Sequence, residues 1–221
     1  MNCNVYLQVA LDFTRLEDAV KIATIIPEDN WIILEAGTPL VKSEGMKSVS
    51  ILRSLSKGRL VTADLKTMDT GGLEAGLAFD SGADITTVLA AAPDETVESA
   101  VHEARRRNKM VMADLIGLPD PSSQVPRLED LGVDIILYHI GIDVQKGRNL
   151  TAGSRSTLVR GISRETSKAL IAVAGGVKPE EAKELHEAGA SIIIIGSAIT
   201  KSPNPTEGVE IFRRFVSPVC G

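Results

Sequence analysis

The stretch LVTADLKTMDTGG, residues 60–72, combines an apolar run with three charged residues and decides how the rest of the chain is interpreted. Its first half is typical of a strand buried in a core, but Asp64, Lys66 and Asp69 follow without a break. A core strand would have to desolvate these charges, which costs free energy unless they are paired. We therefore expect this strand to end at a functional edge of a parallel sheet.

Strand-like and helix-like segments alternate along the whole sequence, which is typical of repeated βα units. The predicted strands are residues 5–11, 31–35, 60–65, 84–89, 110–114, 133–138, 170–174 and 191–195. Apolar residues recur at helical spacing between them, as in residues 16–26, 46–55, 95–108 and 179–190. Eight such units predict an α/β fold, a single (β/α)8 TIM-type barrel domain over residues 1–221, with an open doubly wound sheet as the alternative.

Composition and charge exclude several classes of function. The formal charge of −5 and the pI near 5.3 argue against a general binder of nucleic acid or of anionic membranes. The isoleucine run Ile192–Ile195 is far too short to cross a bilayer and is interpreted as a buried strand. With only Cys3 and Cys220 and no apolar leader, the sequence predicts a reduced cytoplasmic protein without disulfides.

Functional residues of a barrel lie at the C-terminal ends of its strands, so these positions should be polar. Ionisable residues end or closely follow several of the apolar runs: Asp12, Glu35, Asp64, Lys66, Asp114 and His139. Residues i and i+2 of a strand point the same way, so Asp64 and Lys66 should both face the barrel mouth. The carboxylates should keep the lysine protonated, as a stabilising cation or proton donor. The alternative is a structural ion pair, with Asp69 as a helix N-cap.

Two of these strand ends are candidates for metal binding and proton transfer. Glu35 and Asp64 end neighbouring strands, and Mg²⁺ is a hard cation that takes one or two protein carboxylates. A pairing of Glu35 with Lys42 or Lys66 is the alternative. His139 follows the buried run VDIILY, where its imidazole suits proton transfer near neutral pH, unless it is a hydrogen-bonded structural histidine.

The last two predicted strands run into turns of small residues that suit an anion. Loops after strands 7 and 8 are the usual phosphate site of a barrel, because backbone N–H groups are free there. The candidate phosphate-binding residues are Gly175, Gly176, Gly196 and Ser197. Residues 141–156, which carry Lys146, Arg148 and Arg155, are interpreted either as a lid over the phosphate or as an ordinary solvated loop.

The motifs VALD, EAGTPLVKSEG, ADLKTMDTGG, HIGID, AVAGGV and IIIIGSAI occur in this order. With them the chain resembles the orotidine-5′-phosphate decarboxylase superfamily from about Val5 to Phe215, and looks most like the 3-hexulose-6-phosphate synthases within it. The related 3-keto-L-gulonate-6-phosphate decarboxylases typically have Arg three residues after the His, where Ile142 stands here. Orotidine-5′-phosphate decarboxylases typically have Lys where Glu35 stands, and decarboxylase relatives often have Thr where Ala174 stands.

The resemblance implies a homodimer in which Asp69 enters the partner's site. It implies that Glu35 and Asp64 hold Mg²⁺ and that His139 transfers the proton. It also implies that Asp12, Lys66 and the partner-directed Asp69 complete a charged cluster. The implied reaction is a reversible aldol condensation of D-ribulose 5-phosphate with formaldehyde, giving D-arabino-hex-3-ulose 6-phosphate. The alternatives are a 3-keto-L-gulonate-6-phosphate decarboxylase or another sugar-phosphate enzyme of the decarboxylase superfamily, a non-catalytic sugar-phosphate sensor, and one half of a bifunctional enzyme.

Overall fold

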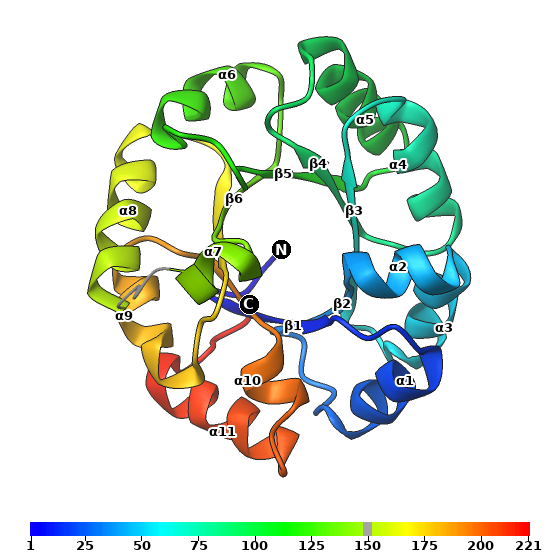
Figure 1. Ribbon diagram of the computed structural model, residues 1–221, viewed down its shortest axis with the longest axis vertical. Coiled ribbons are helices and arrows are strands. Elements are labelled where there is room, and N and C mark those ends of the chain that lie inside the picture. The colour runs from blue at the N-terminus through cyan, green and yellow to red at the C-terminus, as the bar shows by residue number, and fades with distance from the viewer. Residues whose placement is uncertain (148–151) are drawn as a thin grey trace.

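A computed structural model describes residues 1–147 and 152–221, which form a closed barrel of eight parallel strands in the order β1 to β8 (Figure 1). The strands are β1 (Tyr6–Leu11), β2 (Ile32–Ala36), β3 (Leu60–Thr67), β4 (Ile85–Leu89), β5 (Met110–Asp114), β6 (Ile135–His139), β7 (Leu170–Ala174) and β8 (Ile192–Ile195). Because β1 pairs in parallel with both β2 and β8, the sheet has no free edge. The predicted barrel is confirmed, and the open sheet was the wrong alternative.

Helices surround the barrel in a continuous outer ring (Figure 1). They are α1 (Leu16–Ile25), α3 (Lys47–Leu55), α4 (Gly71–Asp80), α5 (Asp94–Arg106), α6 (Val125–Asp130), α8 (Ala152–Glu165), α9 (Ala182–Glu187) and α11 (Pro205–Val216), with the 3-10 turns η1 (Ser122–Gln124) and η2 (Pro179–Glu181). Three short helices, α2 (Thr38–Glu44), α7 (Ile142–Gly147) and α10 (Ser197–Thr200), lie nearer the barrel axis. They directly follow β2, β6 and β8, so they frame the C-terminal mouth. None of the described helices is long and apolar enough to cross a membrane.

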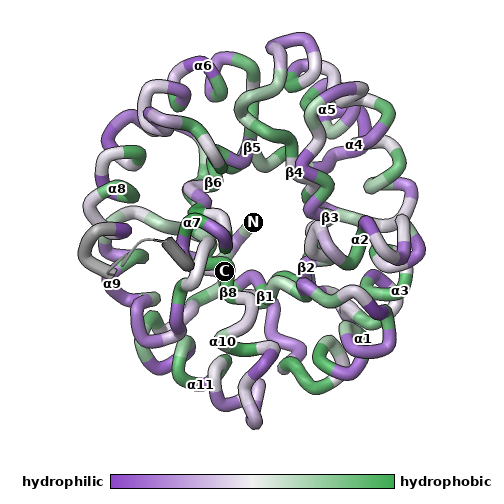
Figure 2. Tube along the Cα trace, viewed as in Figure 1, coloured by the Kyte–Doolittle hydropathy of each residue, from purple (hydrophilic) through white to green (hydrophobic). Residues whose placement is uncertain are grey.

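The strands are buried on both faces, which explains their nearly continuous apolar sequences. In β1, for example, Tyr6 and Ala10 belong to the core inside the barrel, whereas Leu7, Val9 and Leu11 pack in the core between strands and helices. Figure 2 shows hydrophilic segments on the outer helices and loops. The chain therefore has two concentric apolar layers, so a polar group on a strand can reach a ligand only at an end of the barrel.

β3 departs from regular pleating just where its charged residues begin. Its register with β4 shifts between Ala63 and Thr67, as at a β-bulge. Lys66 adopts φ 50°, in the left-handed region that residues with a side chain rarely visit. Its N–H donates a hydrogen bond to Thr87 Oγ1 at 2.9 Å. The bulge thus interrupts the i, i+2 alternation on which the predicted orientation of Asp64 and Lys66 depended.

The two cysteines form a disulfide, so the predicted absence of disulfides is wrong. Cys3 and Cys220 are 217 residues apart in sequence, yet their Cα atoms lie 4.0 Å apart. They form an antiparallel bridge, flanked by the hydrogen bond from Asn4 N–H to Val219 O at 3.0 Å. Because β1 closes onto β8, both ends of the chain meet beneath the barrel, and N and C lie close to its axis in Figure 1. The positions of Cys3 and Cys220 at opposite ends of the sequence did not indicate that they would be close in space.

Candidate active site

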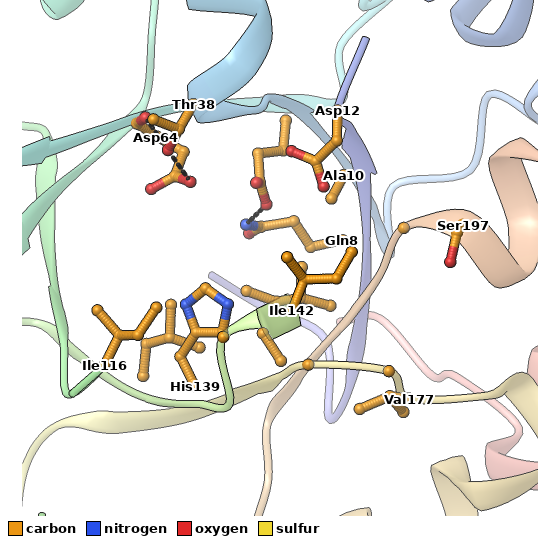
Figure 3. A pocket seen from close by; sticks show the side chains of 18 of the residues that line it. Gln8, Ala10, Asp12, Thr38, Asp64, Ile116, His139, Ile142, Val177 and Ser197 are labelled. Carbon is orange, nitrogen blue, oxygen red and sulfur yellow. Dashed lines mark hydrogen bonds between the residues drawn. The ribbon is translucent and has the colours of Figure 1, made fainter. Parts of the chain in front are cut away.

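A cavity of about 700 Å³ opens at the C-terminal mouth of the barrel, within the range typical of small-molecule sites (Figure 3). The predicted site residues that line it are Asp12, Glu35, Asp64, Lys66, His139, Gly175, Gly176, Gly196 and Ser197. Asp69 does not line this cavity: it is exposed, and its Oδ1 accepts a hydrogen bond from the N–H of Thr70 at 2.7 Å. Thr70, rather than Asp69, is the N-cap residue of α4, and its own side chain makes no capping hydrogen bond.

A buried carboxylate on β5 joins the lysine to the histidine. Asp114 is fully buried, and its Oδ2 lies 3.0 Å from Lys66 Nζ and 2.9 Å from His139 Nδ1. Its Oδ1 accepts a hydrogen bond from Ile116 N–H at 2.9 Å. The ammonium group also lies 2.8 Å from Asp64 Oδ2. One lysine therefore neutralises two carboxylates, and one of these carboxylates holds the imidazole.

The protonation of the lysine follows from these contacts. Burial alone would lower the pKa of Lys66, but the charges of Asp64 and Asp114 and their hydrogen bonds outweigh it and raise the pKa above its usual value. Burial alone would raise the pKa of Asp114, but His139 and Lys66 lower it. These contacts support the expectation that Lys66 stays an ammonium ion, with Asp114 as the matching anion.

The opposite side of the mouth is acidic. Glu35 is 6% exposed, and its Oε2 accepts a hydrogen bond at 2.5 Å from Gln8 Nε2. Gln8 is oriented in turn by Thr62, whose hydroxyl donates to its Oε1 at 3.2 Å. Burial, followed by the charges of Asp64 and Asp12, raises the pKa of Glu35 well above its usual value. A cation beside Glu35 would offset this cost, and among the described residues Glu35 makes no ion pair with a lysine.

Asp12 completes the acidic side from the end of β1. Its side chain packs where a Cβ at Gly37 would stand, which explains the glycine in the EAG motif, and it also approaches Gly196. Although water reaches Asp12 through the mouth, the surrounding protein and the charge of Asp64 raise its pKa against the opposing effect of nearby cations. Three carboxylates thus face a region that already contains one shared ammonium group.

The oxygen donors at the mouth meet the requirements of Mg²⁺. The described residues contain no group of three or more His, Cys, Asp or Glu side chains arranged to hold a metal ion, but Mg²⁺ needs only one or two carboxylates besides water and substrate oxygens. Glu35 has free lone pairs. Both oxygens of Asp64 already accept bonds from Lys66, and Thr87 and Thr38 donate to Oδ1 at 2.8 Å and Oδ2 at 2.6 Å.

The Thr38 hydroxyl decides whether Asp64 has room for an ion. Its oxygen also lies 2.9 Å from the main-chain carbonyl of Asp64, and a hydroxyl carries only one proton. If Thr38 donates to that carbonyl, a lone pair on Asp64 Oδ2 becomes free. The residues therefore fit Mg²⁺, with Glu35 the more available ligand.

The turns after β7 and β8 face the same cavity from the other side. Gly175 and Gly176 have φ of 106° and 64°, which favour glycine, and a Cβ at Gly175 would collide with the carbonyl of Ile140. Gly196 precedes α10, which begins at Ser197. All four candidate phosphate residues are therefore brought together at one side of the mouth.

The segment 141–156 contains two helical pieces. α7 and the start of α8 occupy its ends, so a simple solvated loop is the wrong description of those parts. Arg148 lies outside the described residues, as does the rest of 148–151, so the lid stays a prediction. Arg155 is buried rather than solvated.

Some site residues were missed by sequence reasoning. Asp114 was noted as a strand end, but not as a site residue, although MADL at 112–115 repeats the ADL of TADL at 62–65. Thr38, Thr87 and Gln8 also touch the acidic groups. Gln8 has a sequence signal, since it is a polar residue inside the apolar run of β1. The threonines have none, because threonine is ordinary in strands and helix starts.

The family to which the chain belongs is shown by a family model that matches nearly the whole sequence. The family model described as "Orotidine 5'-phosphate decarboxylase / HUMPS family" matches residues 5–212. The chain belongs to this family.

Curated relatives carry the synthase name. The chain is 36% identical over 212 residues to 3-hexulose-6-phosphate synthase 2 of Staphylococcus saprophyticus, covering 95% of this chain and 96% of that protein. It is 34% identical to the bifunctional enzyme Fae/Hps of Methanoculleus marisnigri, covering 96% of this chain but 53% of that protein. The chain thus spans about half the length of its bifunctional relatives and nearly all of the Staphylococcus saprophyticus synthase.

Solved structures agree with the sequence relatives. A crystal structure of 3-hexulose-6-phosphate synthase has a TM-score of 0.88 and 33% identity, covering 96% of this chain and 100% of that chain. A crystal structure of KGPDC from Streptococcus mutans has a TM-score of 0.82 and 25% identity, covering 96% of this chain and 97% of that chain. The resemblance found in the motifs is therefore confirmed at the level of the family and of its synthase members.

Replacing Asp114 by Asn should lower the free energy of unfolding by about 2–4 kcal/mol at neutral pH, because Lys66 and His139 lose a buried anionic partner. The pKa of Asp114 is lowered from 3.8 in the folded protein, so its charge stabilises the fold above that pH, and the stabilisation is lost as the pH falls below it. Urea unfolding should show the full difference at pH 7 and a smaller one below about pH 4, where the Asp114 carboxylate takes up a proton. Asp130→Asn, on the exposed face of α6, is the matched control, and equal stabilities of the Asp114 variant and wild type at pH 7 would contradict the prediction.

Proposed function

We propose that this chain catalyses the reversible aldol condensation of D-ribulose 5-phosphate with formaldehyde, giving D-arabino-hex-3-ulose 6-phosphate, as the names of its synthase relatives suggest. The observation that carries the proposal is that Lys66 and His139 share one buried oxygen of Asp114 beside the cavity. A general base and a fixed cation are what abstraction of a proton next to a carbonyl requires. The cavity, at about 700 Å³, has room for a five-carbon sugar phosphate together with formaldehyde.

His139 acts as the base in this proposal. Its Nδ1 is held by Asp114, so the tautomer with a proton on Nδ1 leaves the lone pair of Nε2 for the substrate. Nε2 takes a proton from C1 of the ketose, which leaves an enediolate. C1 then bonds to the carbon of formaldehyde, and the former aldehyde oxygen takes up a proton.

The cations of the site stabilise the charge that develops during this reaction. Lys66 presents a permanent ammonium group, and Mg²⁺ held by Glu35 and Asp64 would supply Lewis-acid stabilisation of the enediolate oxygens. Each positioned base or cation contributes roughly a hundred- to a thousandfold in rate. Phosphate binding by the turns after β7 and β8 orients C1 toward His139.

The alternatives are weaker on specific grounds. Ile142 stands where the related decarboxylases typically have Arg, and its exposed side chain lines the cavity without a charge. A sugar-phosphate sensor would not need buried Asp114 with the half-buried Lys66 and His139 around it, since burying charge costs free energy. Binding of ribulose 5-phosphate without turnover would nevertheless favour the sensor.

The proposed active unit is a homodimer. Asp69 is exposed outside the cavity of its own chain, next to Met68, and the following helix exposes Leu73 and Leu77. These apolar side chains suit a second copy of the chain, whose cavity would receive Asp69. Sedimentation at micromolar concentration tests this: a monomer with full activity would contradict a shared site.

A cytoplasmic location is also part of the proposal, because the substrate is a phosphorylated metabolite. The Cys3–Cys220 disulfide argues the other way, since such bonds are uncommon in the cytosol. Alkylation of free thiols before cell lysis distinguishes the two: a protected disulfide would contradict a reducing location.

Chelation of divalent ions should abolish the condensation of ribulose 5-phosphate with formaldehyde, because Glu35 and Asp64 would then face the enediolate without a compensating ion. Activity should return when Mg²⁺ is added back. The measurement is formaldehyde consumption before and after exhaustive dialysis against chelator. Full activity without divalent ions would reject the metal-assisted reaction.

Substituting His139 by Asn should slow exchange of the C1 proton of ribulose 5-phosphate with solvent by about a hundredfold or more, while leaving ligand binding nearly unchanged. Asn keeps a polar group of similar size but cannot take up the proton. Exchange is followed by NMR in deuterated water. His186→Asn is the matched control, because His186 lies on α9 and bonds to the carbonyl of Ala190, away from the cavity. Normal exchange in the His139 variant would remove it from the base role.

A further inference from the structure

Arg155 is a buried cation that the proposed reaction does not use. It lies on α8 and is 6% exposed. Its Nη1 donates to Glu181 Oε1 at 3.1 Å, whereas its Nε has no hydrogen-bond partner among the described residues. Burying a guanidinium group with an unpaired N–H is costly, so its presence here calls for a compensating role.

The guanidinium of Arg155 lies next to the turn that follows β7. Its Nη2 lies 3.3 Å from the place that a Cβ would occupy at Gly176, so it packs directly against this glycine. Gln145 packs against the same glycine, and its Nε2 donates to the carbonyl of Ile140 at 2.6 Å. The turn is thus held between a neutral amide and a cation.

Glu181 links the same cation to the next residues of the turn. One carboxylate oxygen binds Arg155, and the other accepts the N–H of Lys178 at 2.7 Å. The pair therefore fixes the turn as well as carrying charge. A test has to separate these two contributions, and the opposite charges of Arg155 and Glu181 allow that.

An anion in this cavity needs a cation of this kind. The carboxylates of Asp12, Glu35 and Asp64 share the cavity and would repel a phosphate dianion. Lys178 and Lys201 also line the cavity, but both are exposed, so dissolved ions screen their charges. A buried charge is screened much less.

We propose that Arg155 is a positioning residue whose buried charge, acting through the Gly176 turn, stabilises the phosphate of the substrate. The inference rests on the proposed function for the identity of the ligand, a sugar phosphate. It goes beyond that function by assigning to the anion a buried counter-charge, which dissolved ions screen less than they screen Lys178 and Lys201, on a side chain behind the turn.

The test is direct calorimetric titration with inorganic phosphate and with D-ribulose 5-phosphate, neither of which requires turnover. Arg155→Gln should weaken binding of both ligands about tenfold, which corresponds to about 1.4 kcal/mol. The loss should persist in about 0.5 M NaCl, a concentration at which the smaller loss caused by Lys178→Gln should largely disappear, because salt screens an exposed charge. Arg155→Lys should recover part of the affinity.

Glu181→Gln separates charge from scaffolding. Gln keeps an acceptor for the N–H of Lys178 but removes a negative charge, so binding should be equal to wild type or tighter. If Glu181→Gln weakens binding as much as Arg155→Gln, the pair is only a scaffold and the proposal is overturned. Unchanged phosphate affinity in Arg155→Gln would also overturn it. If Arg155→Gln does not fold, Glu181→Gln alone tests the proposal. Phosphate binding equal to wild type or tighter supports the role of Arg155, and weaker binding overturns it.

Failure of the Arg155 proposal can be distinguished from failure of the proposed function. Wild-type protein that binds phosphate with the expected Arg155 and Glu181 contrast, but does not condense formaldehyde with ribulose 5-phosphate, would reject the aldol reaction and retain the role of Arg155. Protein that catalyses the condensation but lacks the contrast between the Arg155 and Glu181 variants would retain the aldol reaction and reject the role of Arg155.

Discussion

The site depends on one ammonium group shared by two carboxylates. Lys66 bridges Asp64 on its own strand and Asp114 two strands away, and Asp114 holds His139 on the next. Each of these groups would be costly to bury alone, and the network is stable because each member has a partner of opposite charge or a hydrogen bond. A single proton lost from Lys66 would leave two adjacent anions, which is why its protonated form is so strongly favoured.

The barrel provides the distances that this network needs, and an irregularity in β3 provides the direction. Neighbouring strand ends stand side by side in a closed parallel sheet, so β3, β5 and β6 can present groups to one point. The bulge and the left-handed φ of Lys66 turn its backbone out of the regular pleat, and Thr87 on β4 holds the turned N–H. Local strain at Lys66 is therefore compensated by contacts that exist only in the folded barrel.

The sequence was sufficient for the barrel and for most of the charged residues because both depend on local patterns. Apolar runs locate strands, and in this fold the residues that follow a strand necessarily face one mouth. The bulge at Lys66, the disulfide and the role of Asp114 depend instead on which segments meet after closure. Glu129 illustrates the same limit: its carboxylate accepts bonds from three successive N–H groups at 167–169, and these contacts, against the effect of its partial burial, lower its pKa to about 2. Nothing in the sequence around Glu129 on its helix predicts that it binds the N–H groups of residues 167–169.

The charges of the cavity are arranged in an order that suits a substrate with a phosphate at one end and a reacting carbon at the other. The glycine turns after β7 and β8 lie on one side of the mouth, with Arg155 behind them, and the acidic groups of β1, β2 and β3 lie around the rim from them. A phosphate placed among the carboxylates would meet like charge, whereas an enediolate placed at the turns would find no base. In the proposed reaction, only one orientation would bring the dianion to the buried guanidinium and C1 to His139. The acidic rim that opposes phosphate binding would then also oppose binding of the substrate in the reverse orientation.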